Sequence, residues 1–214
     1  MKHLIVSCIA IIIGLNITAL AQMTDDKSEV YIEQVMYHED SEVIELNVSN
    51  TPFAWPDHIL VENFLYLNMM LQDLASGVRN VAYGLQDGDR NTMEIKQTGS
   101  GHTALSMQYG SGNTHDITQN ASNTAAAGLQ VGDNNTISQL LDGYDINAIA
   151  IQIGNGNSII SELSGLFGGG AFGIQQEGNF NMLHQYEYGK SVPYRVRQSG
   201  NGMELMIIEG QVVR

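Results

Sequence analysis

The chain has 214 residues, and its 23 Asp and Glu outweigh its 9 Lys and Arg to give a formal net charge of −14. So acidic a chain gives no reason to expect nucleic-acid binding, because that binding rests on basic side chains that neutralise phosphates. The chain contains 23 Gly, 3 Pro and a single cysteine, Cys8. We expect Cys8 to leave with an N-terminal signal, so that backbone pairing and packing, not disulfides, must hold the fold.

The first residues predict a secretory signal over residues 1–21. Lys2 supplies a positive start, Leu4 to Leu15 is almost continuously apolar, and residues 19–21 form a small-x-small cleavage site. The apolar run is shorter than the roughly 20 residues that a membrane span needs. We therefore expect export, with a mature chain that begins at Gln22 and is soluble or attached to a surface.

Residues 22–79 form a segment that does not fit the pattern of the rest of the chain. Residues 30–48 alternate loosely and could pair as strands, and Pro52 and Pro56 mark a break. Residues 58–75 carry apolar side chains at helix-like spacing. Those positions are Leu60, Phe64, Leu67, Leu71 and Leu74. The segment is either a targeting or chaperone-recognition element or an arm with no specific role.

Residues 80–214 contain an internal repeat, which is the main signal of the sequence. The motif Gln-x-Gly recurs six times at spacings of 22, 22, 22, 24 and 22 residues. An Asn stands five residues after each Gln except the last, where Met203 replaces it. The glutamines are Gln86, Gln108, Gln130, Gln152, Gln176 and Gln198. The glycines are Gly88, Gly110, Gly132, Gly154, Gly178 and Gly200, and the asparagines are Asn91, Asn113, Asn135, Asn157 and Asn181.

Each unit is predicted to form strand, tight turn, strand, tight turn. Small, apolar or amide residues alternate with others along both strands, which is the period of a β-strand with one dry face. The intervening positions carry most of the charge, as Glu94, Lys96, Asp116 and Glu162 illustrate. We expect these intervening positions to point outward, toward solvent.

This pattern predicts an all-β fold, a β-solenoid of six rungs that stack at about 4.8 Å. Like residues then lie above like residues, so buried amides hydrogen-bond along the axis as they do in cross-β structures. A further amide column is expected eleven residues after the first two glutamines, at Gln97 and Gln119. The motif glycines suit turns that need a positive φ.

The unit Gln-x-Gly-x-x-Asn, followed by five residues and Gln, resembles the curlin repeat. The first two units match best, at Gln86 to Gln97 and at Gln108 to Gln119. The resemblance implies a subunit of a curli amyloid fibre that leaves through an outer-membrane secretion machinery and assembles with other curlin subunits. It further implies adhesive, biofilm-forming fibres outside the bacterial cell and no enzymatic activity or cofactor.

The last repeat departs from the curlin pattern. It has Met203 for Asn, Pro193 in a strand and Glu209 at an inward position, and it is rich in basic residues. These are Lys190, Arg195, Arg197 and Arg214. A degenerate basic last repeat resembles the minor, nucleating curlin, which docks at the outer-membrane surface. The alternatives are a major subunit, or a capping rung of the kind that terminal solenoid repeats often form.

No arrangement for catalysis, cofactor binding or a metal is identified in the sequence. His102 and His115 are expected to point inward as column or core residues rather than as metal ligands, because they lack a Cys/His ligand set. A monomeric carbohydrate- or ice-binding solenoid would need a uniform outward array, and the outward positions here are mixed. A solenoid hydrolase or lyase would need a longer stack with carboxylates in a cleft.

Overall fold

The computed structural model describes residues 18–23, 29–35, 80–164, 170–189, 193–208 and 211–213. Every regular element in this part of the chain is a β-strand. The strands form two layers, a seven-stranded sheet of odd-numbered strands and an eight-stranded sheet of even-numbered strands and β15. We call these the odd sheet and the even sheet.

The strands are short, and from β3 to β14 they follow one another at nearly constant intervals. Their bounds are β1 Thr18–Met23, β2 Glu29–Val35, β3 Val81–Asp87, β4 Thr92–Ser100, β5 Thr103–Tyr109, β6 Thr114–Ser122, β7 Ala125–Val131, β8 Thr136–Tyr144, β9 Ile146–Ile153, β10 Ser158–Ser164, β11 Gly170–Glu177, β12 Met182–Tyr188, β13 Tyr194–Ser199, β14 Glu204–Ile208 and β15 Gln211–Val213.

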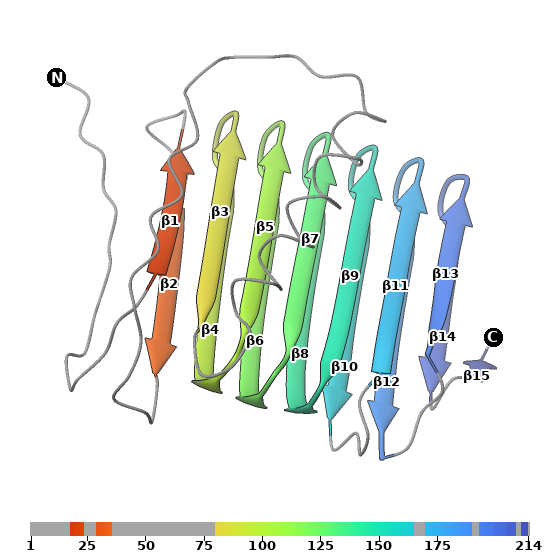
Figure 1. Ribbon diagram of the computed structural model, residues 1–214. Helices are drawn as coiled ribbons and strands as arrows, with labels where there is room; N and C mark the ends of the chain where they lie inside the picture. The colour runs from red at the N-terminus through yellow and green to blue at the C-terminus, as the bar shows by residue number, and fades with distance from the viewer. Residues whose placement is uncertain are drawn as a thin grey trace, which may run out of the picture.

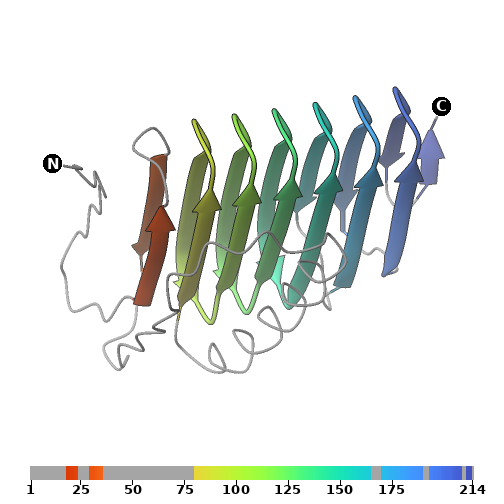
Figure 2. The same ribbon diagram turned by 90° about the horizontal axis from the view of Figure 1, so that it is seen from above.

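Successive repeats stack as rungs of a solenoid, which confirms the predicted fold class. Rung 1 is β3 with β4, rung 2 is β5 with β6, and so on to rung 6, β13 with β14. Neighbouring rungs pair in parallel and in register, so Gln86 lies over Gln108 and Gln108 over Gln130. The two sheets face each other across a thin core along the whole stack (Figure 2).

The turns stack as well as the strands. Gly88, which follows β3, has a φ of 117°, a backbone conformation that glycine adopts without a steric penalty. The amide of Gly110 donates to the carbonyl of Asp87 at 2.9 Å, and the amide of Gly112 donates to Asp89 at 2.9 Å. The turns therefore continue the hydrogen bonding of the sheets around the corner between them.

Inward side chains of both sheets make the core. Apolar members come from the columns predicted to point inward, such as Ala104, Ile117 and Leu163, each 0% exposed. One inward column of the odd sheet changes size along the stack, because Phe172 in rung 5 takes the place that Ala104 has in rung 2. Buried amides accompany these apolar residues, near the end of the strand for Gln86 and within the strand for Gln139.

The outer faces of the two sheets differ, and here the expectation of polar outward positions is wrong for one of them. Outward residues of the even sheet, such as Thr114 and Glu94, are exposed or half-buried. The odd sheet instead carries buried apolar residues on its outer face over rungs 1 to 4, among them Tyr83 and Leu105. Parallel strands buried on both faces read as near-continuous apolar runs, and VAYGL in β3 has that character.

Further strands pair at both ends of the stack. At the first end β1 pairs in parallel with β3, and β2 pairs with β4. At the other end β15 pairs with β14 in antiparallel orientation, while β13 is the edge strand of the odd sheet. β2 covers the beginning of residues 30–48, which the sequence predicts could pair as strands. Residues 36–79 lie outside the described residues.

Candidate functional site

The central feature of the stack is a column of glutamines that runs through all six rungs. Each side-chain amide donates from Nε2 to Oε1 of the glutamine in the next rung, for example from Gln108 to Gln130 at 2.9 Å and from Gln130 to Gln152 at 3.0 Å. The other steps measure 2.6 Å from Gln86, 2.9 Å from Gln152 and 2.7 Å from Gln176 to Gln198. No member is more than 2% exposed.

The same glutamines also tie the odd sheet to the even sheet. The Nε2 atom of Gln130 donates to the backbone carbonyl of Thr114 at 2.9 Å, and that of Gln152 donates to Thr136 at 3.0 Å. A buried amide without a partner costs about 1–3 kcal/mol. Here both amide hydrogens are used, one along the axis and one across the core, so each rung needs the next one for its own polar groups.

A second column consists of the motif asparagines, which secure the turns. Asn135 donates from Nδ2 to the carbonyl of Gly154 in the next rung at 2.7 Å. Its Oδ1 accepts from the backbone amide of Asn157 at 3.0 Å. The same pattern holds for Asn91, Asn113, Asn157 and Asn181.

The motif glycines lie so close to one another along the axis that no side chain fits between them. A Cβ atom on Gly132, whose φ is 116°, would lie 2.1 Å from the carbonyl oxygen of Gly154. Gly88, Gly110, Gly154 and Gly178 are equally crowded, with 1.9–2.2 Å to the next glycine oxygen. Gly200 in rung 6 differs, because its nearest contact is the flexible side chain of Met203 at 3.3 Å.

Comparison with protein families matches this region. The family described as Curlin associated repeat matches residues 88–120, from the turn after β3 to a point within β6. Residues 88–120 are therefore similar to the curlin repeat. Comparisons with curated proteins and with solved structures find no match. The matched residues contain the turns and the even strands of rungs 1 and 2, where the curlin motif is most complete.

The second glutamine column, predicted at Gln97 and Gln119, ends at Gln119, and the next rung shows why. Gln97 donates to Gln119 at 2.8 Å, but Leu141 takes the next position. The Nε2 atom of Gln119 turns instead to the carbonyl of Thr124 at 2.9 Å and to its hydroxyl at 3.0 Å. The hydroxyl of Thr124 contacts Nδ1 of His102 at 2.7 Å, so His102 occupies a column position.

Another column lies in the turns and was not predicted. Oδ1 of Asp133 accepts from the amide of Ser111 at 2.8 Å, and Asn155 accepts from the amide of Asp133 at 2.8 Å. Asn179 and Asn201 continue the series. The signal was present in the sequence, because Asp or Asn stands directly after the motif glycine in these repeats. These residues are exposed or half-buried, so the column adds more to register than to stability.

His115 is a buried core residue and not a ligand. Its Nδ1 lies 2.6 Å from the hydroxyl of Ser106 and its Nε2 lies 3.2 Å from Oε1 of Gln139. The ring fills the space beside Gly128, where a Cβ atom would lie 2.0 Å from Cε1. Burial lowers the pKa of His115 to about 4, so the imidazole is neutral at pH 7.

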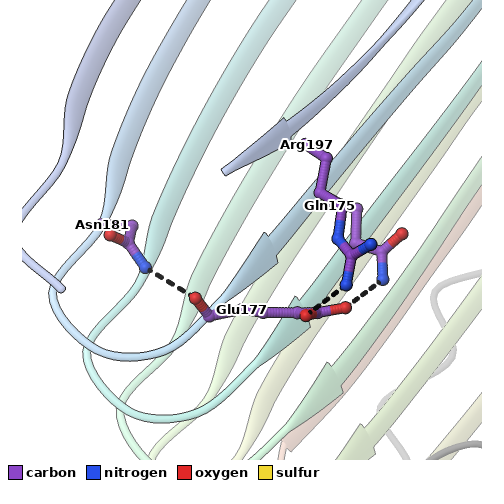
Figure 3. A network of polar contacts seen from close by, with 4 residues as sticks. All are labelled: Gln175, Glu177, Asn181 and Arg197. Carbon is purple, nitrogen blue, oxygen red and sulfur yellow. Dashed lines mark hydrogen bonds and ion pairs between the residues drawn. The ribbon is translucent and has the colours of Figure 1, made fainter. Parts of the chain in front are cut away.

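The predicted surface-docking cluster is described only in part. Arg195 and Arg197 are exposed on the outer face of β13, while Lys190 and Arg214 lie outside the described residues, as Glu209 does. Arg197 forms an ion pair with Glu177 of rung 5 at 2.6 Å, and Gln175 donates to the other carboxylate oxygen at 2.7 Å (Figure 3). The Arg197 side chain remains 63% exposed.

Among the described residues of rungs 5 and 6, one carboxylate is buried. Glu187 is 0% exposed and occupies the column that Gln97 and Gln119 begin. The hydroxyl of Tyr194 donates to it and accepts from Nε2 of Gln185 at 2.8 Å. Burial, and next the hydrogen bond to Glu187, raise the pKa of Tyr194. The tyrosine ring packs edge-on against Phe172, with 5.4 Å between centroids.

The described residues hold no group of three or more His, Cys, Asp or Glu side chains placed to bind a metal ion. No helix that could cross a membrane is found in this part of the chain. What the arrangement does offer chemically is a repeated template. Each rung presents backbone groups and side-chain amides in the geometry that the next rung needs.

Proposed function

We propose that the chain is a structural subunit of an extracellular amyloid-type fibre of the curli kind. The observation that supports this most is the uninterrupted glutamine column, which joins every rung to the next through buried hydrogen bonds of 2.6–3.0 Å. A strand at the edge of a sheet can pair with another chain. β13 is such an edge among the described strands.

The first end of the stack fits this proposal once the signal is removed. Cleavage before Gln22 takes away residues 18–21, four of the six residues of β1 that pair with β3. The odd sheet of the mature chain then offers β3 at one end and β13 at the other. Contact between unlike ends produces open filaments rather than closed rings.

Within this family we favour the minor, nucleating subunit, with the major subunit as the alternative. In rung 6, Met203 ends the asparagine column and β15 pairs with β14 in antiparallel orientation. The basic side chains of Arg195 and Arg197 point outward on the same rung. Such an end suits attachment to an anionic outer-membrane surface better than unlimited growth, while residues 22–79 would address the secretion machinery.

The test is assembly of the purified mature chain at neutral pH, followed by an amyloid dye and electron microscopy. A nucleator is expected to shorten the lag of a partner curlin at substoichiometric amounts, whereas a major subunit polymerises fully by itself. A chain that stays monomeric and neither grows nor seeds contradicts the proposal and favours a monomeric binding solenoid.

Substitutions in the glutamine column distinguish assembly through this column from nonspecific association. The double variant Gln86→Glu/Gln108→Glu places two like charges in adjacent buried positions, and an uncompensated buried charge costs about 3–5 kcal/mol. We expect it to abolish fibres. The matched control, Thr92→Glu/Thr114→Glu, adds the same charges on adjacent rungs at exposed outward positions. Equal kinetics for both variants would remove the column from the explanation.

A further inference from the structure

Exposed hydrophobic side chains are unevenly distributed along the stack. Among the described residues, seven large hydrophobic side chains are exposed by 37–72%, and six of them lie in rungs 5 and 6. These six are Phe180, Met182, Tyr188, Met203, Met206 and Ile208. The seventh, Tyr144, ends β8 in rung 3. Exposed apolar side chains are thus concentrated at the end of the stack that contains β13 and β14.

The outward side chains of β12 and β14 lie next to one another on the outer face of the even sheet. The register of the two strands places His184 beside Met206 and Tyr186 beside Ile208. The rings of His184 and Tyr186 lie nearly parallel, with 6.3 Å between centroids and 26° between planes. We define the flank patch as Met182, His184, Tyr186, Tyr188, Met206 and Ile208. It is an area of thioether, aromatic and aliphatic side chains two strands wide.

Charged side chains on this face lie outside the flank patch. Rungs 1 to 4 each carry at least one outward carboxylate, and rung 6 carries Glu204 at the start of β14. The carboxylates of rungs 1 to 4 include Glu94, Asp116, Asp142 and Glu162. No Asp, Glu, Lys or Arg points outward from β12. Because the chain has a net charge of −14, two copies repel each other over much of their surface. On the outer face of the even sheet this repulsion is smallest at the flank patch.

A second copy of the chain matches the flank patch in shape and in chemistry. Two sheets pack face to face at about 10 Å, with apolar side chains between them. In an isologous contact the same patch of both copies meets, so the aromatic rings of β12 pack against aromatic rings. We propose that the chain associates side by side with a second copy through the flank patch. The contact lies on the flank of the stack and leaves the edge strand β13 accessible.

The size of the flank patch limits the strength of this contact. Two strands about 4.8 Å apart and seven residues long, at about 3.3 Å per residue, give a projected area of roughly 10 Å by 23 Å. Stable complexes bury about 800 Å² on each partner, so a single pair of copies binds weakly. In a filament of this chain the flank patch recurs every six rungs, about 29 Å, and the contacts along two filaments add. This repetition rests on the proposed function, whereas the contact between two copies does not.

Cross-linking of single-cysteine variants of the mature chain tests the proposal, because the one cysteine of the sequence, Cys8, lies in the predicted signal. Tyr186→Cys places a thiol in the flank patch. Thr118→Cys is the matched control, since Thr118 is also half-buried and occupies the same column three rungs earlier. A short bismaleimide joins two thiols by adding each one across a carbon–carbon double bond. We expect Tyr186→Cys to form cross-linked dimers about tenfold faster than Thr118→Cys, because docked copies raise the effective concentration of the thiols.

A second pair of variants decides the case in which Tyr186→Cys disturbs rung 5. Met182 and Thr114 are both exposed and share another outward column, and substitutions at such surface positions change stability little. We expect Met182→Cys to cross-link faster than Thr114→Cys in soluble chain and in filaments. Equal rates within both pairs overturn the proposal, including the case in which a partner of another kind occupies the flank patch.

Charge substitutions separate this contact from fibre formation. Tyr186→Lys adds a charge to the flank patch and Ser138→Lys adds one outside it, and each site has an acidic neighbour in the preceding rung, Glu162 or Asp116. We expect both variants to bind an amyloid dye as the unmodified chain does. Electron microscopy should show paired filaments for Ser138→Lys and single filaments for Tyr186→Lys, and paired filaments for Tyr186→Lys would overturn the proposal. If no variant forms filaments, the proposed function fails, while the cross-linking rates of soluble chain still decide this proposal.

Discussion

Rung 3 and rung 6 follow the same repeat plan but are held in different ways. In rung 3, Gln130 has a glutamine partner on both sides, at 2.9 Å and 3.0 Å. In rung 6, Gln198 has one such partner, Gln176 at 2.7 Å, and Met203 stands where the asparagine column would continue. The difference teaches that a rung draws much of its stability from its neighbours, as in other repeat proteins.

The largest difference in unfolding free energy between rungs 3 and 6 is expected when alanine replaces the motif glycine. Gly132→Ala combines a positive φ with a Cβ atom 2.1 Å from a backbone oxygen, so we expect a loss of about 3–5 kcal/mol in the free energy of unfolding. Gly200→Ala meets only the flexible Met203 side chain at 3.3 Å and should cost about 1–2 kcal/mol. Urea midpoints of the two variants measure the difference, and equal losses would contradict neighbour dependence.

Acid should destabilise rung 2 through His115. At the equivalent position rung 6 has Leu205. The pKa of His115 is about 4 in the fold, against 6.5 ordinarily, so between these values the unfolded chain binds a proton that the folded chain does not. Stability therefore falls as pH drops from 6.5 to 4, by up to about 3 kcal/mol. His115→Gln should flatten this part of the curve of unfolding free energy against pH. An unchanged curve would show that other groups cause the dependence.

Substitutions at the asparagine-column position of rung 3 and of rung 6 test the comparison further. Asn135→Ala removes the donor to Gly154 and the acceptor for Asn157, and we expect a cost of about 2 kcal/mol. Met203→Asn restores the motif in rung 6, and among the described residues no following rung offers it a glycine carbonyl, so its effect on the urea midpoint should be near zero. A loss for Met203→Asn as large as that for Asn135→Ala would argue against the asymmetry.

The smallest expected effect concerns the buried carboxylate near the last rung. Tyr194→Phe keeps the ring against Phe172 but removes the hydroxyl that donates to Glu187. We expect a loss of about 1 kcal/mol, which Glu187→Gln should partly relieve in a double-mutant cycle. Additive effects of the two substitutions would show that the hydrogen bond contributes nothing.

Much of the fold follows from the sequence because one circuit of the chain repeats six times. The spacing of Gln86, Gln108 and Gln130 predicts both the rungs and the amide column, since only stacking brings such residues together. The buried outer face of the odd sheet could not be predicted in the same way. Tyr83 and Leu105 occupy outward positions of their strands, and the period of two does not tell which outward face is buried. The pairing of β1 with β3 could not be predicted either, because residues 18–23 carry no repeat motif.

The glutamine side chains all donate in the same sense, from each rung to the one that follows it in the chain. Their amide dipoles therefore add along the stack instead of cancelling. A filament made by repeating this contact has a direction, with two tips of different chemistry. We expect time-lapse atomic force microscopy to show one fast-growing and one slow-growing tip on each filament.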